Sequence, residues 1–166
     1  MLLLTLLPAA SGVAEARDYV RLHVIASDDS AEAQALKFRV RDAVLARARA
    51  LLDGVEDADA AWAAVTAHRV VLEAAARSEA RDRGYMGDVR CETGVYPFPD
   101  RWYGGVRVPA GDYRALRVKI GAAEGRNWWC VLYPSLCYPE DMDPDAPVFY
   151  SALLNWFRAL TGGDGA

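Results

Sequence analysis

The predicted domain covers residues 18–138, and only one block within it has helical periodicity. Strand-like alternation lies on both sides of that block. Apolar residues recur at helical spacing from about 31 to 83, broken only by the short connection GVED, which predicts an antiparallel pair of helices. Before the block, YVRLHVIA at 19–26 alternates as a half-buried strand does. A helical pair between strands buries its apolar face against a sheet, so the predicted class is α+β.

After Tyr85 the sequence is typical of strands and turns. Alternation predicts strands near 89–95 and 127–133, and a hairpin in which 106–108 and 113–120 flank the turn PAGD. The prolines of YPFPDRWYGG remove backbone donors, so that segment cannot be a central strand. The expected order is β-α-α-β-β-β, a mixed or antiparallel sheet of about four strands with the helical hairpin on one face.

Both ends of the chain differ in composition from the predicted domain. Residues 1–17 contain the apolar run Leu2 to Leu7 and the cleavage-like sequence AEA, which predicts an export signal or a curtailed membrane segment. That run is too short to span a bilayer. Contact of the N-terminus with a membrane surface stays an alternative. Residues 139–147 form an acidic, proline-broken linker, and 148–161 have the spacing of an amphipathic C-terminal helix. Such a helix would pack on the domain or meet a partner or a membrane.

Charge and motifs exclude several classes of function. The formal net charge is −4, without the basic balance of nucleic-acid binding. The sequence contains no phosphate loop, dinucleotide fingerprint or HExxH motif, so we expect no cofactor and no small-molecule substrate. The three cysteines, Cys91, Cys130 and Cys137, lack CxxC spacing and are far in sequence from His23 and His68. We therefore predict no metal site.

Cys130 and Cys137 lie on either side of a proline and admit three interpretations. If the chain reverses at 133–135, the two Cα atoms come within the roughly 7 Å that a disulfide needs, in an oxidising compartment. Alternatively, both are buried free thiols. The third interpretation is a cysteine hydrolase that pairs either thiol with His23, although mid-strand cysteines are usually buried and inert.

Two adjacent tryptophans, Trp128 and Trp129, lie in the last predicted strand. Neighbouring strand residues point to opposite faces, so one indole should face solvent or be covered by another element such as the C-terminal helix. Tryptophan and arginine dominate binding hot spots. The predicted partner-binding residues, from this strand and from the proline-glycine segment, are Arg126, Trp128, Trp129, Arg101, Trp102 and Tyr103.

Several segments of the chain, in this order, closely resemble the stage II sporulation protein R family. They are YVRLHVIASDDS, QALKFRVRDAVL, YPFPDRWYGG, VPAGDYRALRVKIG and GRNWWCVLYPSLCY. The resemblance covers about residues 18–138, and FYSALLNWFRAL near the end loosely resembles the short C-terminal helix of the family. The N-terminus departs from the family, because the expected membrane or signal segment is curtailed.

The resemblance implies a signalling protein and not an enzyme. Proteins of this family are secreted from the forespore into the space between forespore and mother cell. There they activate a membrane-embedded aspartic protease of the mother cell, the stage II sporulation protein GA, which processes pro-sigma-E. Two alternatives stay open from the residues alone: the extracytoplasmic cysteine hydrolase, and a structural interaction domain of the spore envelope.

Overall fold

The computed structural model describes residues 16–103 and 106–134. Most of the predicted export segment 1–17, the linker 139–147, the helix 148–161 and Cys137 lie outside these ranges. After a short 3-10 turn the elements follow the expected α+β order. They are β1 (Val20–Ile25), α1 (Ala31–Leu52), α2 (Ala58–Ala67), α3 (Arg69–Asp82), β2 (Val89–Phe98), β3 (Arg101–Tyr103), β4 (Val106–Val108), β5 (Gly111–Ile120) and β6 (Asn127–Tyr133).

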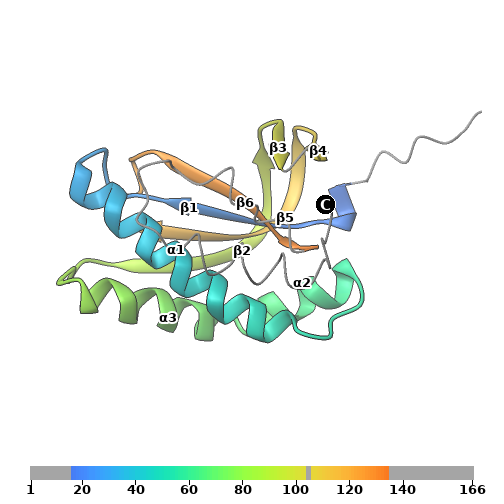
Figure 1. Ribbon diagram of the computed structural model, residues 1–166, viewed down its shortest axis with the longest axis horizontal. Helices are drawn as coiled ribbons and strands as arrows, with labels where there is room; N and C mark the ends of the chain where they lie inside the picture. Colours follow the sequence, from blue (N-terminus) through green and yellow to red (C-terminus); the bar gives the residue numbers. More distant parts are fainter. Residues whose placement is uncertain (1–15, 104–105, 135–166) are drawn as a thin grey trace, which may run out of the picture.

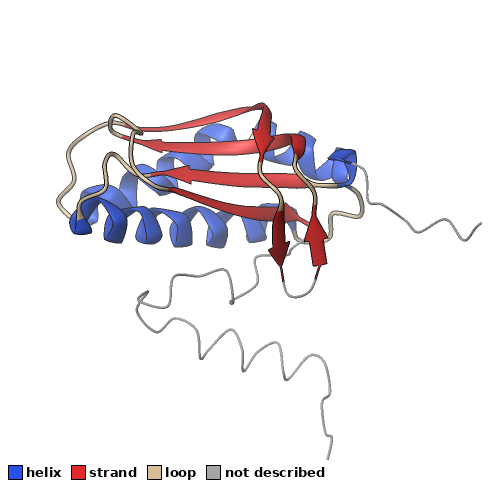
Figure 2. Ribbon diagram, turned by 90° about the horizontal axis from the view of Figure 1, so that it is seen from above, coloured by secondary structure: helices blue, strands red, loops and turns tan. Residues whose placement is uncertain are grey.

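Four strands form a mixed sheet in the order β2-β5-β1-β6. β1 is parallel to β5, whereas the β1–β6 and β2–β5 pairs are antiparallel. The helices cover one face of this sheet, and the small β3–β4 hairpin projects from the other face (Figures 1 and 2). The predicted class and the placement of the helical pair on one face are confirmed.

The main core lies between the sheet and the helices. Alternate residues of each strand point into it, as the period of two requires. Each fully buried Val, Leu or Ile side chain contributes about 1.5–3 kcal/mol relative to exposure. The strand residues of this core include Leu22, Val24, Leu116, Val118, Ile120, Val89, Trp128 and Leu132, and the helices add Val40, Val44, Val65 and Leu72.

The second predicted helix is two helices. His68 ends α2 and begins α3 with φ −102° and ψ 16°, which departs from helical geometry. Its ring atom Nδ1 lies 2.9 Å from the carbonyl oxygen of Ala64 and so engages the last turn of α2. Apolar spacing continues on both sides of the break, which is why periodicity alone predicted one helix.

The predicted hairpin between 106–108 and 113–120 is wrong. β4 pairs with β3 instead, while β5 pairs with β2 on one side and β1 on the other. The β2–β5 ladder continues to Phe98 opposite Gly111, so only the residues between them remain to form a separate hairpin. Pro97 belongs to β2, an edge strand, where a missing backbone donor is tolerated.

Side chains of α3 cover part of the outer edge of β2. Arg77 Nε donates to Val89 O at 2.8 Å, and Arg69 Nη1 donates to Cys91 O at 2.9 Å. Between them, the Cys91 N–H donates to Glu73 Oε2 at 2.9 Å. Backbone groups that an adjacent strand would otherwise pair are thus satisfied by a helix.

Candidate functional site

The β3–β4 hairpin exposes a large aromatic side chain. Trp102 is 58% exposed, and its cross-strand partner is the exposed Arg107. Arg107 Nε lies 3.0 Å from Asp100 Oδ1, at the base of the hairpin. Cross-strand partners point to the same face, so Trp102 and Arg107 together form an outward aromatic and cationic surface. We call this pair the hairpin surface.

The next residue, Tyr103, anchors the hairpin to the sheet. It is 1% exposed, and its hydroxyl accepts a hydrogen bond of 2.7 Å from Arg21 Nη2. Arg21 is fully buried, packs over the rings of Phe98 and Tyr113 at 4.5 and 5.0 Å, and donates through Nε to Cys130 O. Burial lowers the pKa of the Arg21 guanidinium from its ordinary value. The exposed tryptophan is therefore held by a rigid buried contact at the adjacent position.

Trp129 lies on the same face of the sheet as this anchor. Its ring stacks on His23 with centroids 3.7 Å apart and meets Phe98 edge-on at 4.9 Å. His23 Nε2 lies 2.8 Å from Asn127 Oδ1. Burial lowers the pKa of His23 to about 4, against its ordinary 6.5. The imidazole is consequently neutral at physiological pH and acts as an aromatic packing group.

This shift predicts that His23 contributes to the acid sensitivity of the folded protein. The unfolded chain protonates His23 near pH 6.5 while the folded chain keeps it neutral down to about 4, so acid favours unfolding. Between about pH 7 and about pH 5, His23 should reduce the free energy of unfolding by about 2 kcal/mol. Urea denaturation of the wild-type protein and of His23→Gln across this range measures the difference.

The exposed His68 provides the control for this prediction. His68→Gln should leave the acid sensitivity of the wild-type protein intact. Parallel stability curves for wild type and His23→Gln would contradict the assignment.

Trp128 and Trp129 divide between the two faces as the strand period requires. Trp128 is 7% exposed and lies in the core beneath α1, where the Arg41 guanidinium is 4.9 Å from its ring. Trp129 is half-buried on the opposite face. Trp128 therefore has no surface to offer a partner, and the same holds for Tyr103.

The structure does not gather the predicted partner-binding residues into one surface. Arg101 and Trp102 are exposed on the hairpin near the start of β1, whereas exposed Arg126 precedes β6 beside the end of β1. Arg126 is held there through its backbone N–H, which donates to Asp29 Oδ1 at 2.7 Å. Sequence reasoning missed Arg107, although the alternation of VRV at 106–108 was a signal that its middle residue faces outward.

A hydrolytic pair of Cys130 and His23 is not assembled. Cys130 is buried in the core on the helix-covered face, opposite Leu22 in the register, and His23 points to the other face. Cys91 also lies on the core side, and its burial raises the pKa of the thiol to about 12. Cys137 lies outside the described residues, so its bridge to Cys130 stays a prediction.

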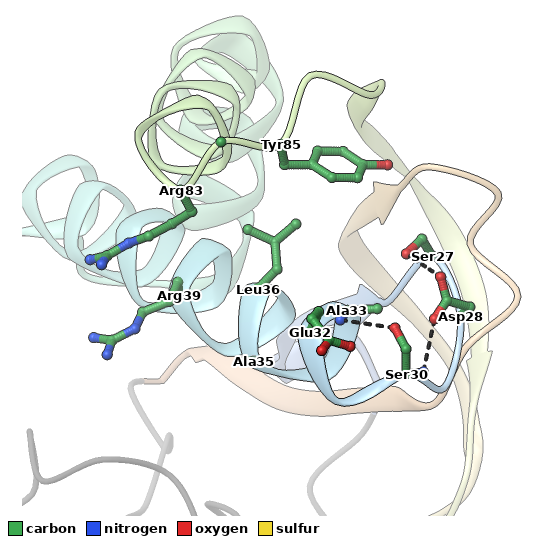
Figure 3. Close-up of a pocket in the computed structure, with 11 residues that line it drawn as sticks. Ser27, Asp28, Ser30, Glu32, Ala33, Ala35, Leu36, Arg39, Arg83 and Tyr85 are labelled. Carbon is green, nitrogen blue, oxygen red and sulfur yellow. Dashed lines mark hydrogen bonds between the residues drawn. The ribbon is translucent and has the colours of Figure 1, made fainter.

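A pocket of about 420 Å³ lies between the start of α1 and the turn after α3 (Figure 3). At one end Ser27 Oγ donates to Asp28 Oδ2, and Ser30 Oγ accepts from the Ala33 N–H as the cap of α1. Arg39 and Arg83 lie at the other end (Figure 3). The serines and Asp28 are thus engaged in starting the helix and do not form a nucleophile with a base.

Within residues 16–103 and 106–134, no three His, Cys, Asp or Glu side chains are grouped so that they could hold a metal ion. The helices of the same ranges include none with the length and hydropathy needed to cross a membrane.

The fold and the hairpin surface define a small α+β domain with an exposed tryptophan held on a rigid base. Comparison with known proteins adds the family: the family model for stage II sporulation protein R matches residues 16–143. The chain belongs to the stage II sporulation protein R family, as the sequence resemblance predicted.

A curated relative supports the same assignment. The stage II sporulation protein R of Bacillus subtilis (strain 168) is 30% identical over 127 residues, which cover 76% of this chain and 57% of that protein. The chain therefore spans little more than half the length of this relative. No solved structure matches the chain.

Proposed function

We propose that this protein is a secreted sporulation signal that activates the membrane-embedded aspartic protease of the mother cell, stage II sporulation protein GA. The activated protease would then process pro-sigma-E. In this proposal the protein leaves the forespore and acts in the intermembrane space. Membership of the stage II sporulation protein R family supports the role in sporulation.

The hairpin surface is the observation that carries the binding part of this proposal. An indole that is 58% exposed leaves a large apolar area in water. Its neighbour Tyr103 is fixed by a hydrogen bond to buried Arg21, so little conformational entropy is lost when a partner covers Trp102. A pre-ordered tryptophan beside an arginine matches the composition of protein–protein hot spots.

Activation requires that the protein bind the active state of the protease more tightly than the inactive state. Stabilising an active dimer of the protease would satisfy this requirement. The test is a titration of the protein, with its predicted disulfide formed, against the purified extracytoplasmic region of the protease. Measuring the dimer fraction of the protease tests both binding and stabilisation of the dimer. Saturable binding that raises the dimer fraction is expected. Absence of binding at high micromolar concentration would exclude the proposal.

A structural interaction domain of the spore envelope is the second candidate, since an exposed tryptophan also fits a static contact. Deletion of the gene separates the two functions. A signal is required for pro-sigma-E processing, so its deletion should leave the precursor uncleaved. An envelope component would leave cleavage intact and alter the assembled spore.

A further inference from the structure

The pocket shown in Figure 3 has an apolar middle and opposite charges at its two ends. Leu36 of α1 and Tyr85, in the turn after α3, line the middle. Arg39 and Arg83 lie on one side of Leu36, whereas Glu32 lies on the other (Figure 3). The volume of about 420 Å³ is within the range of small binding sites, about 300–1,000 Å³. We call this site the Leu36 pocket.

The ring of Tyr85 is held in place by close packing against two glycines. A Cβ atom at Gly87 would overlap this ring, and one at Gly121 would lie 2.5 Å from its hydroxyl oxygen. Gly121 also has a φ of +56°, which glycine adopts without strain. Both positions therefore leave the space that the phenol fills. This wall of the pocket is consequently rigid, so a ligand that packs on it loses little binding energy to ordering the protein.

The two arginines have donor groups to offer a ligand. Arg39 is half-buried and forms no hydrogen bond or ion pair with another residue of the described ranges, 16–103 and 106–134. Arg83 is exposed and donates through Nε to Glu79 Oε1 at 3.0 Å, which leaves its two Nη groups for a ligand. Guanidinium groups match a carboxylate, because its two oxygens accept paired hydrogen bonds from arginine.

The distance between the charged ends fits a short piece of extended polypeptide. Along α1, Glu32 and Arg39 are about 10 Å apart at 1.5 Å per residue. Three extended residues span about the same length. The last residue of a chain carries its carboxylate next to its own side chain, so it can reach Arg39 and Leu36 together. The N–H groups of the preceding residues would then lie toward Glu32, whose carboxylate is an acceptor.

We propose that the Leu36 pocket binds the C-terminal residues of a partner polypeptide. The terminal carboxylate lies at Arg39 and Arg83, and an apolar last side chain packs against Leu36. Capture of a terminal carboxylate is a recurring mode of peptide recognition. The arginines reach solvent, where ion pairs are weak, so the pocket alone binds weakly. It therefore suits a polypeptide that makes further contacts elsewhere on the domain.

This site is separate from the hairpin surface. The pocket begins at Ser27, just past the end of β1, whereas the hairpin is anchored through Arg21 near the start of that strand. A partner in the Leu36 pocket would thus leave Trp102 exposed. The proposal does not rest on the proposed function, and its test needs no protease.

A nuclear magnetic resonance titration of the full-length protein tests the proposal. The probe is the peptide acetyl-Ala-Ala-Leu with a free C-terminal carboxylate. It should shift the amide signals of Leu36, Gly84 and Tyr85 in a saturable way, with a Kd of about 1–10 mM. Two matched peptides each lack one component: acetyl-Ala-Ala-Leu-amide has no carboxylate, and acetyl-Ala-Ala-Ser has no apolar side chain. Each should bind at least about fivefold more weakly.

The variant that carries Arg39→Gln and Arg83→Gln should also bind acetyl-Ala-Ala-Leu at least about fivefold more weakly. Arg81→Gln is the matched control, because Arg81 is an exposed arginine near the end of α3 that does not line the pocket. It should leave the affinity unchanged. All three arginines reach solvent, so these variants keep the core intact.

Two kinds of result would overturn the proposal. One is the absence of any saturable shift of the three amide signals up to about 50 mM peptide, well above the expected Kd. The other is equal affinity where a loss is expected, either for one of the two matched peptides or for the double arginine variant.

Discussion

Trp128→Ala is expected to lower the free energy of unfolding by about 3–5 kcal/mol, which is the range for removing a large aromatic side chain from a core. The indole is 7% exposed and fills the space between β6 and α1, where it also supports the guanidinium of Arg41. The midpoint of thermal unfolding should fall by about 2–4 °C for each kcal/mol. Circular dichroism with heating measures the shift.

Trp102→Ala provides the matched comparison, because it removes the same side chain from an exposed position. Its melting temperature should stay close to that of the wild-type protein, since surface changes usually alter stability by less than about 0.5 kcal/mol. Equal melting temperatures for the two variants would show that Trp128 is not a core residue.

The second large effect is expected on binding and signalling, and it concerns the exposed Trp102 instead of the buried Trp128. Trp102→Ala should weaken binding to the proposed partner protease by roughly 30-fold, the loss that a hot-spot residue worth about 2 kcal/mol produces. Processing of pro-sigma-E in sporulating cells should fall accordingly while the protein stays folded. Immunoblots of the precursor and mature forms provide the measurement.

Met86→Ala is the control for that experiment. Met86 is 82% exposed in the turn between α3 and β2, away from the hairpin, and its loss should leave processing unchanged. Arg107→Gln, beside Trp102 on the hairpin surface, should weaken binding in the same direction. Normal processing by Trp102→Ala would remove the hairpin surface from the proposed interface.

Local patterns in the sequence were sufficient to predict the class of fold. The alternation at 19–26 and at 113–120, and the helical spacing between them, depend only on near neighbours in the chain. Pairing between strands that are distant in sequence does not depend on near neighbours, so local patterns cannot predict it. Nothing in Val106–Val108 shows that it pairs backward with Arg101–Tyr103, because this follows from the length of the β2–β5 ladder.

The candidate site was predictable to a smaller extent. The rule that adjacent strand residues face opposite sides predicted that only one of Trp128 and Trp129 lies in the helix-covered core, but it could not identify which. That choice depends on the register of β6 against β1, where Cys130 lies opposite Leu22. The burial of Arg21 was also beyond the sequence, because its aromatic surroundings come from β2, β3 and β5.

The side chains of α3 along β2 limit how this protein can meet another copy of itself. An incoming strand would need the backbone donors and acceptors of Val89 and Cys91. These are already bonded to side chains of α3, namely Arg77, Glu73 and Arg69. Further along the same strand, Pro97 has no N–H to offer. The β2 side of the sheet is consequently a poor template for strand addition and for the fibrils that such addition starts. The fold therefore discourages strand addition at its β2 edge while Trp102 of the hairpin surface stays exposed.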